Sequence, residues 1–138
     1  MEPGDVSAVA IVLAAGAGRR VGAEEPKAFL SIGGRPMLAV AVGAAAASPS
    51  VRSIVVAAPA GWEEQARRCA EGCGAPFVVV TGGATRQASV RAALEALPPE
   101  TTVVAVHDAA RPFAPPDLFT AAIAAVTETT PGVVPVAP

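Results

Sequence analysis

The chain has 138 residues, which fits about one domain at the usual size of ~100–200 residues. Hydrophobic residues make up 52% of it, which argues against disorder, and four Phe, one Trp and no Tyr leave a mainly aliphatic core. The net charge of −2 gives no reason to expect nucleic-acid binding. We see no signal-peptide pattern and no apolar run near the ~18 residues of a membrane span. We therefore expect a cytoplasmic protein that binds neither nucleic acid nor membrane.

Short aliphatic runs and helix-compatible stretches alternate along the chain. The runs are continuous rather than alternating, which is typical of strands buried on both faces, and they cover residues 8–15, 53–58, 77–81, 102–107 and 132–136. The predicted helices cover residues 36–47, 62–72, 86–97 and 116–128; Pro36 and Pro116 suit first helical positions, and Gly72 suits a C-cap. This order predicts one doubly wound α/β domain with a mostly parallel sheet and helices on both faces.

Ligands of such sheets bind outside the carboxyl ends of the strands. The loop after the first predicted strand contains Gly16 and Gly18, followed by Arg19, Arg20 and, further on, Lys27. Glycines let the backbone turn sharply and expose N–H groups that bind anions, and the cations add full positive charge. The loop therefore predicts a phosphate site, with a glycine turn and solvated arginines as the alternative. Neither the dinucleotide fingerprint nor the Walker A pattern is satisfied.

The loop after the third predicted strand reads GGATRQASV, residues 82–90. We expect Gly82 and Gly83 to expose backbone groups, and Arg86 and Ser89 to lie at the start of a helix, where N–H groups and hydroxyls can meet a base or phosphate. The alternative is an ordinary helix N-terminus after a glycine turn.

The loop after the fourth predicted strand reads VHDAARPF, residues 106–113. Asp108 is well placed to bind Mg²⁺, which prefers oxygen ligands beside substrate phosphates. The alternative is a salt bridge from Asp108 to Arg111 that orders the turn. We expect His107 to be structural rather than a general base.

The string LAAGAGRRVGAEEPKAFL resembles the nucleotidyltransferase signature, and the three loops together resemble the 2-C-methyl-D-erythritol 4-phosphate cytidylyltransferase family. The resemblance implies a Rossmann-like three-layer α/β/α sandwich of the nucleotide-diphospho-sugar transferase type. It also implies CMP transfer from CTP to 2-C-methyl-D-erythritol 4-phosphate with release of pyrophosphate, in non-mevalonate isoprenoid biosynthesis. By the same resemblance, residues 1–138 form a single nucleotide-binding domain that is incomplete at its carboxyl end, and the full-length protein is a homodimer.

The resemblance also implies site residues. Arg20 and Lys27 would stabilise the transition state, Asp108 would bind Mg²⁺, and Arg111 would lie on the acceptor side. The implied nucleotide-binding residues are Ala14, Ala15, Gly16, Gly18, Arg19, Gly82, Gly83, Arg86, Ser89 and Ala109.

Two positions depart from the family pattern, and two other functions stay open. Ala84 and Ala88 stand where acidic residues are common, so base contacts should rely more on backbone. The alternatives are a nucleotidyltransferase for ribitol phosphate or a sugar phosphate, and a nucleotide-binding protein without turnover. The second gains weight because residues 112–138 contain no lysine or arginine, so we expect the chain alone to bind nucleotide and catalyse poorly.

Overall fold

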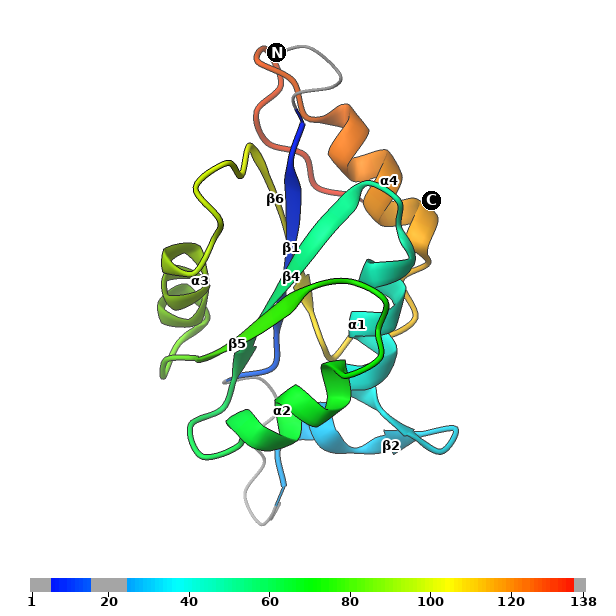
Figure 1. Ribbon diagram of the computed structural model, residues 1–138, viewed down its shortest axis with the longest axis vertical. Helices are drawn as coiled ribbons and strands as arrows, with labels where there is room; N and C mark the ends of the chain where they lie inside the picture. The colour runs from blue at the N-terminus through cyan, green and yellow to red at the C-terminus, as the bar shows by residue number, and fades with distance from the viewer. Residues whose placement is uncertain (1–5, 16–24, 136–138) are drawn as a thin grey trace.

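The computed structural model describes residues 6–15 and 25–135 (Figure 1). The predictions for Gly16, Gly18, Arg19 and Arg20 therefore lie outside the described residues. The strands are β1 (Ala8–Leu13), β2 (Ser31–Ile32), β3 (Arg35–Pro36), β4 (Val51–Ala58), β5 (Phe77–Thr81) and β6 (Val103–Asp108). The helices are the 3-10 turn η2 (Lys27–Phe29), α1 (Met37–Ala47), α2 (Glu63–Ala70), α3 (Arg86–Glu95) and α4 (Pro116–Ala125).

Four parallel strands form the main sheet, in the order β5-β4-β1-β6. The central strand β1 is aliphatic and fully buried, as expected for a strand covered on both faces. The register brings the carboxyl ends of the strands level: Leu13 pairs with both Ala57 and Asp108, and Ala58 pairs with Thr81. The segments that follow these strands therefore begin at one edge of the sheet. The predicted doubly wound fold is confirmed.

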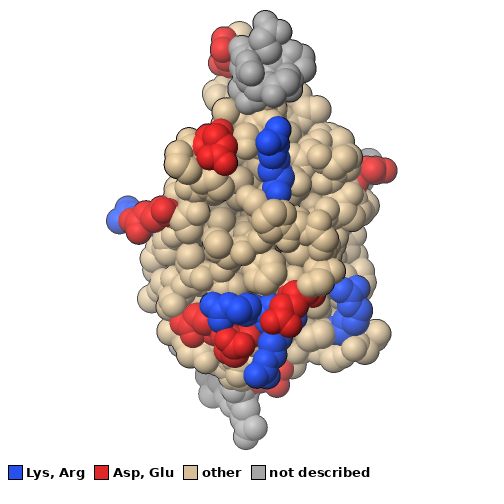
Figure 2. Space-filling model, in the orientation of Figure 1, with Lys and Arg blue, Asp and Glu red and all other residues tan. Residues whose placement is uncertain are grey.

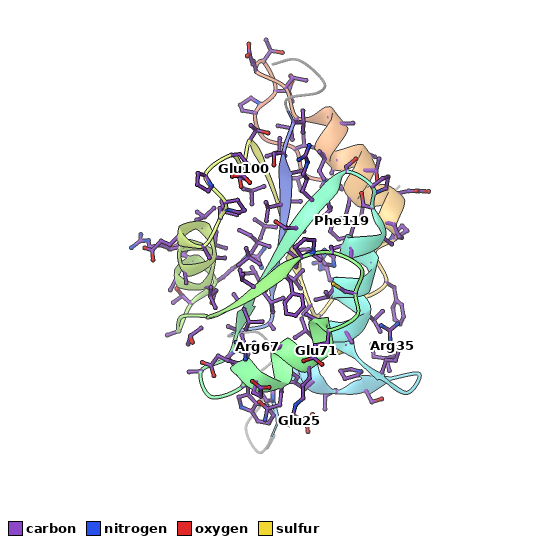
Figure 3. All side chains as sticks on the ribbon, in the orientation of Figure 1. Glu25, Arg35, Arg67, Glu71, Glu100 and Phe119 are labelled. Atoms are coloured by element: carbon purple, nitrogen blue, oxygen red, sulfur yellow. The ribbon has the colours of Figure 1, made fainter. Side chains whose placement is uncertain are left out.

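Helices cover the two faces of this sheet unequally (Figure 1). Helices α1, α2 and α4 pack on one face over the larger core, whereas α3 packs on the other face against β1, β4 and β5. Figure 3 shows side chains filling the space between the sheet and both helical layers, with Phe119 projecting from α4. The strand β6 lies at the edge of the described sheet, and α3 does not cover it as it covers the other strands.

The structure corrects the prediction of a fifth strand at residues 132–136. Residues 132–135 have no strand conformation, and residue 136 lies outside the described part of the chain. Pro135 has no N–H group to donate to a β-ladder, and the aliphatic side chains of this segment instead line a cavity beside β6. Pro36 is also corrected: it is the N-cap residue of α1 and ends β3, rather than being the first helical residue.

The other three predicted helices are present, but each ends two or three residues earlier than predicted, at Ala70, Glu95 and Ala125. Pro116 begins α4, and Gly72 follows α2 with φ +75°, a conformation that suits glycine. The short hairpin β2–β3 was missed, because two-residue strands have no readable periodicity.

Charged side chains of both signs gather over the end of the molecule that carries α2, and much of the centre of this face is uncharged (Figure 2). Glu63, Glu64, Arg67 and Arg68 belong to that helix. Within residues 6–15 and 25–135, no helix has both the length and the apolar character needed to cross a membrane.

Candidate nucleotide site

Backbone hydrogen bonds join the loops at the carboxyl edge of the sheet. The Ala14 N–H donates to the Ala57 carbonyl at 2.9 Å, the Gly82 N–H to the Ala58 carbonyl at 2.7 Å, and the Ala109 N–H to the Leu13 carbonyl at 2.9 Å. The structure therefore brings together the predicted residues that follow β1, β5 and β6. Ala14, Ala15 and Ala109 are all buried, so they shape the floor of this edge.

Glycine is required at positions 82 and 83 because a Cβ atom would clash with neighbouring atoms, and not because of the backbone conformation. A Cβ atom at Gly82 would lie 2.3 Å from the Ala15 Cβ and 2.8 Å from the Ser89 Oγ, and one at Gly83 would lie 2.3 Å from the Ala88 Cβ. Neither glycine has a positive φ. These contacts bring the start of α3 directly against the end of β1. We call residues 82–89 the base loop.

Ser89 fixes the base loop from inside. Its side chain is 0% exposed, and its Oγ accepts a hydrogen bond from the Gly83 N–H at 3.1 Å. Thr85, the residue just before α3, caps this helix: its hydroxyl accepts a hydrogen bond from the Ala88 N–H at 3.1 Å. The cap was missed at the sequence level, although a threonine just before a helix is an ordinary N-cap signal.

The two glycines of the base loop do not leave their own N–H groups free for a ligand. The N–H groups of Ala14, Gly82 and Gly83 all donate to other groups of the protein. Each carbonyl oxygen has two lone pairs and can accept a further hydrogen bond. The arrangement therefore suits a ligand that donates hydrogen bonds at this position.

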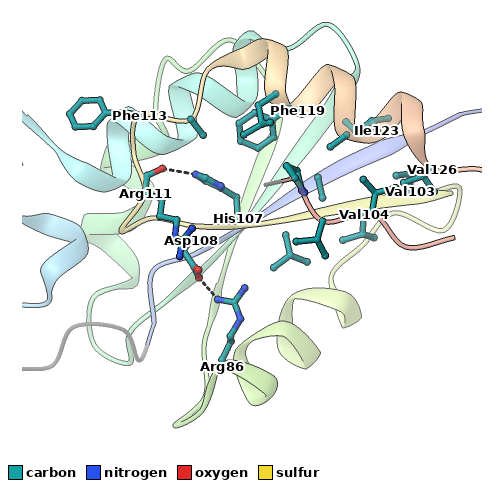
Figure 4. A pocket seen from close by; sticks show the side chains of 18 residues that line it. Arg86, Val103, Val104, His107, Asp108, Arg111, Phe113, Phe119, Ile123 and Val126 are labelled. Atoms are coloured by element: carbon teal, nitrogen blue, oxygen red, sulfur yellow. Dashed lines mark hydrogen bonds and ion pairs between the residues drawn. The ribbon is translucent and has the colours of Figure 1, made fainter. Parts of the chain in front are cut away.

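Asp108 ends β6 and forms an ion pair with Arg86, the first residue of α3 (Figure 4). The aspartate side chain is 29% exposed and the arginine side chain 58% exposed. The alternative pairing of Asp108 with Arg111 is not the one observed: the Arg111 N–H donates to the Asp108 carbonyl at 3.0 Å. Arg86, Asp108 and Arg111 all line one cavity of about 600 Å³ along β6.

His107 has contacts that favour a structural role. Its Nε2 lies 2.8 Å from the Arg111 carbonyl oxygen, and its ring meets the edge of Phe119 in α4 at a centroid distance of 5.2 Å. These two contacts hold the turn after β6 against α4.

Lys27 begins the 3-10 turn η2, directly after Pro26, and is partly exposed. The turn is anchored by Phe29, whose ring stacks on Trp62 at a centroid distance of 5.2 Å. The proposed role of Lys27 stays a prediction, and the sequence gave no signal for this turn or for the aromatic contact that positions it.

Two groups have shifted pKa values. The Thr81 hydroxyl donates a 2.6 Å hydrogen bond to Glu63 and thereby lowers the pKa of that carboxyl. Partial burial raises the pKa of the Cys69 thiol, so this cysteine is less readily ionised to a thiolate. Neither group belongs to the base loop or to the turn after β6.

A parallel α/β sheet with helices on both faces, and with a glycine-built loop and a carboxylate at its carboxyl edge, defines an α/β domain of the Rossmann-like class. The family model for 2-C-methyl-D-erythritol 4-phosphate cytidylyltransferase matches residues 8–138, and the chain belongs to this family.

Relatives and a solved structure agree with this membership. The chain is 49% identical to the 2-C-methyl-D-erythritol 4-phosphate cytidylyltransferase of Streptomyces coelicolor, over 94% of this chain and 49% of the relative. It is 44% identical to that of Streptomyces avermitilis, over 99% of this chain and 56% of the relative. The crystal structure of 4-diphosphocytidyl-2C-methyl-D-erythritol synthase from Anaerococcus prevotii is similar with a TM-score of 0.76 and 27% identity, over 88% of this chain and 51% of that one. The chain thus spans about half the length of these relatives.

Proposed function

We propose that the chain carries the nucleotide site of an enzyme that transfers CMP from CTP to 2-C-methyl-D-erythritol 4-phosphate and releases pyrophosphate, in non-mevalonate isoprenoid biosynthesis. The observation that carries the proposal is the family match over residues 8–138, which includes all three loops at the carboxyl edge. The names of the relatives support the same reaction.

The hydrogen bonds of the base loop support a preference for cytosine. Cytosine presents an exocyclic amino group, a donor, where uracil presents a carbonyl oxygen, an acceptor. Because the N–H groups of Ala14, Gly82 and Gly83 are engaged, the backbone has carbonyl acceptors to offer. Such acceptors match cytosine and would repel uracil. Ala84 and Ala88, at the start of the loop and in the first turn of α3, contribute no polar side chain, so selection relies on backbone.

Phosphate binding and transition-state stabilisation are assigned to cationic residues. Lys27 and Arg20 would stabilise the charge that develops as the α-phosphorus is attacked, since phosphoryl transfer depends on positioning and charge stabilisation. Gly16, Gly18 and Arg19 would surround the triphosphate, and Ala109 would lie near the ribose.

A magnesium ion fits the donor set at the end of β6. Among the described residues, no group of three or more His, Cys, Asp or Glu could hold a metal by itself. Mg²⁺ is commonly bound by one or two carboxylates together with substrate phosphates, which is what Asp108 beside a triphosphate would provide. The ion would neutralise negative charge on the phosphates.

The acceptor side is less complete. Arg111 lies beside the cavity along β6 and would approach the acceptor phosphate, but residues 112–138 add no further cation. We propose that additional cations, from another part of a homodimer, complete this side in the cytoplasmic enzyme.

The experiment is a pyrophosphate-release assay with Mg²⁺, in which each of the four nucleoside triphosphates is combined with 2-C-methyl-D-erythritol 4-phosphate, ribitol 5-phosphate or a sugar 1-phosphate. The Streptomyces coelicolor relative serves as the positive control. We expect release with CTP and 2-C-methyl-D-erythritol 4-phosphate, at a rate well below that of the control. Release with another pair identifies a different nucleotidyltransferase, and CTP binding without release for any acceptor identifies a binding protein without turnover.

A substitution at Lys27 tests the role of the cation. Lys27→Ala should lower the rate of release by about 10²–10³ with only a modest loss of CTP affinity, because transition-state charge is stabilised more than ground-state charge. Arg52→Ala is the matched control, since it removes one positive charge near the start of β4, at the opposite end of the sheet. Equal rates for Lys27→Ala and the control would make Lys27 an ordinary surface residue.

A further inference from the structure

Arg86 and Asp108 join the two halves of the candidate site through one ion pair. Arg67 and Arg68 pair with Glu64 inside α2, whereas Arg86 reaches from the base loop to the end of another element, β6 (Figure 4). We propose that Arg86 is a positioning residue that exchanges partners. It holds the Asp108 carboxylate until a divalent cation binds there, and it then turns to a phosphate of the nucleotide. The phosphate part of this inference rests on the proposed function.

The first step is a competition for one carboxylate. The Arg86 Nη1 contacts the Asp108 Oδ1, the kind of oxygen that Mg²⁺ approaches to 2.0–2.1 Å. A guanidinium group and a divalent cation also repel each other. The two cations therefore exclude one another at this oxygen, and Arg86 lowers the affinity of Asp108 for metal.

The second step is the ease of the exchange. The Arg86 side chain is 58% exposed, and Asp108 is not sealed from solvent, so water and salt screen their attraction. Exposed pairs of this kind are weak and are readily replaced. The pair can therefore keep the carboxylate oriented and still give way to a divalent cation.

The third step is the new partner of Arg86. The residue is the first of α3 and directly follows the Thr85 cap, so its backbone is fixed to the base loop. A guanidinium group binds phosphate through two parallel hydrogen bonds, which lysine cannot reproduce. Once released from Asp108, the Arg86 side chain is exposed and mobile while its backbone stays fixed, so its guanidinium group can bind a phosphate of the nucleotide.

The metal arm of the test uses Mn²⁺ alone. Mn²⁺ broadens the NMR signals of nearby amides even when binding is weak, and the amides of Asp108 and Ala109 are the reporters. We expect Arg86→Gln to lower the Mn²⁺ concentration for half-broadening by about two- to fivefold, the factor that an exposed pair contributes. Arg91→Gln, an exposed arginine in the same helix, should leave it unchanged, and Asp108→Asn should abolish the broadening.

The nucleotide arm uses CTP with Mg²⁺ in a calorimetric titration. Arg86→Gln should weaken CTP binding by roughly tenfold, in the opposite direction to its effect on Mn²⁺, because a charge-assisted contact to phosphate is lost. Arg86→Lys should recover only part of this affinity, and Arg91→Gln should bind CTP like the unchanged protein.

Each result decides the inference. Broadening that is absent at Asp108 in every variant, or that is unchanged or weaker in Arg86→Gln, overturns the competition. CTP affinity that is unchanged in Arg86→Gln overturns the exchange. The metal arm contains no nucleotide, so a loss of CTP preference would count against the proposed function without touching the competition between Arg86 and metal.

Discussion

The loops after β5 and β6 meet at the same edge of the sheet but are built in opposite ways. After β5, the base loop is closed by small residues: Gly82 lies against Ala15, Gly83 against Ala88, and the buried Ser89 hydroxyl binds Gly83. After β6, the turn is held by backbone, while its charged groups stay at least partly exposed.

This difference separates two requirements of a nucleotide site. A base is recognised by fixed acceptors at fixed positions, so a loop without room for movement is suitable. A divalent cation and phosphates arrive with their own charge, so the residues that meet them need exchangeable partners, which is the role we propose for the partly exposed pair of Asp108 and Arg86.

The largest effect is expected at Gly82. Gly82→Ala places a Cβ atom 2.3 Å from the Ala15 Cβ and 3.2 Å from the Ala58 carbonyl oxygen, so the loop must shift. We expect the free energy of unfolding to fall by about 3 kcal/mol and CTP binding to be lost. Urea unfolding and calorimetry measure the two effects.

Gly43→Ala in α1 is the control, since its Cβ would meet only the Arg35 side chain at 3.7 Å. This variant should be as stable as the unchanged protein or slightly more stable. If Gly82→Ala behaves like Gly43→Ala, the base loop is not tightly packed and the contrast with β6 disappears.

Ser89→Ala should have the next largest effect. The Ser89 side chain is 0% exposed and accepts a hydrogen bond from the partly buried Gly83 N–H, so its removal should lower the free energy of unfolding by about 1–2 kcal/mol. CTP binding should weaken as the loop loosens. Stability and CTP affinity that both stay unchanged would mean that Ser89 does not hold the loop.

Asp108→Asn should affect stability and binding separately. Because the ion pair with Arg86 is partly exposed, its loss should change the free energy of unfolding by less than about 1 kcal/mol. The increase in CTP affinity on adding Mg²⁺ should nevertheless disappear, as titrations with and without the metal would measure. A destabilisation as large as that of Ser89→Ala would make Asp108 a structural residue like those of the base loop.

The smallest effect concerns the hydrogen bond that ties the end of β5 to α2. The pKa of Glu63 is lowered from 4.5 by the Thr81 hydroxyl, so its stabilising effect is present above pH 4.5 and is lost as the pH falls through the lower folded-state pKa. Glu63→Gln and Thr81→Val should both flatten the dependence of unfolding free energy on pH below 4.5. Equal slopes for both variants and the unchanged protein would show that this bond has no effect on stability.

The sequence predicted those parts of the fold that depend on continuous burial. The run at residues 77–81 became β5 with the same bounds, because its aliphatic residues pair in the sheet beside β4. The run at residues 132–136 is also rich in valine, but it contains Pro135 and did not form a strand in its described residues. Composition alone does not show whether a neighbouring strand is present to accept the ladder hydrogen bonds.

The candidate site was predicted in its position but not in its contacts. Gly82, Asp108 and Ala109 could be placed at one edge because parallel strands end there. The sequence could not reveal that Arg86 pairs with Asp108, since 22 residues separate them and only the packing of α3 brings them together. It also suggested exposed backbone groups at Gly82 and Gly83, whereas hydrogen bonds within the protein engage the N–H groups of both.

The most direct test of a preformed cytosine site is the relative affinity of the chain for the four nucleoside triphosphates with Mg²⁺, measured by calorimetry. Because the N–H groups of Ala14, Gly82 and Gly83 are engaged and the carbonyls of these residues can accept, CTP should bind at least about tenfold more tightly than UTP, the energy of roughly one well-formed hydrogen bond to backbone. CTP should likewise bind more tightly than ATP and GTP. Equal affinities for all four nucleotides would contradict the account, because the base loop would then take no part in recognising the base.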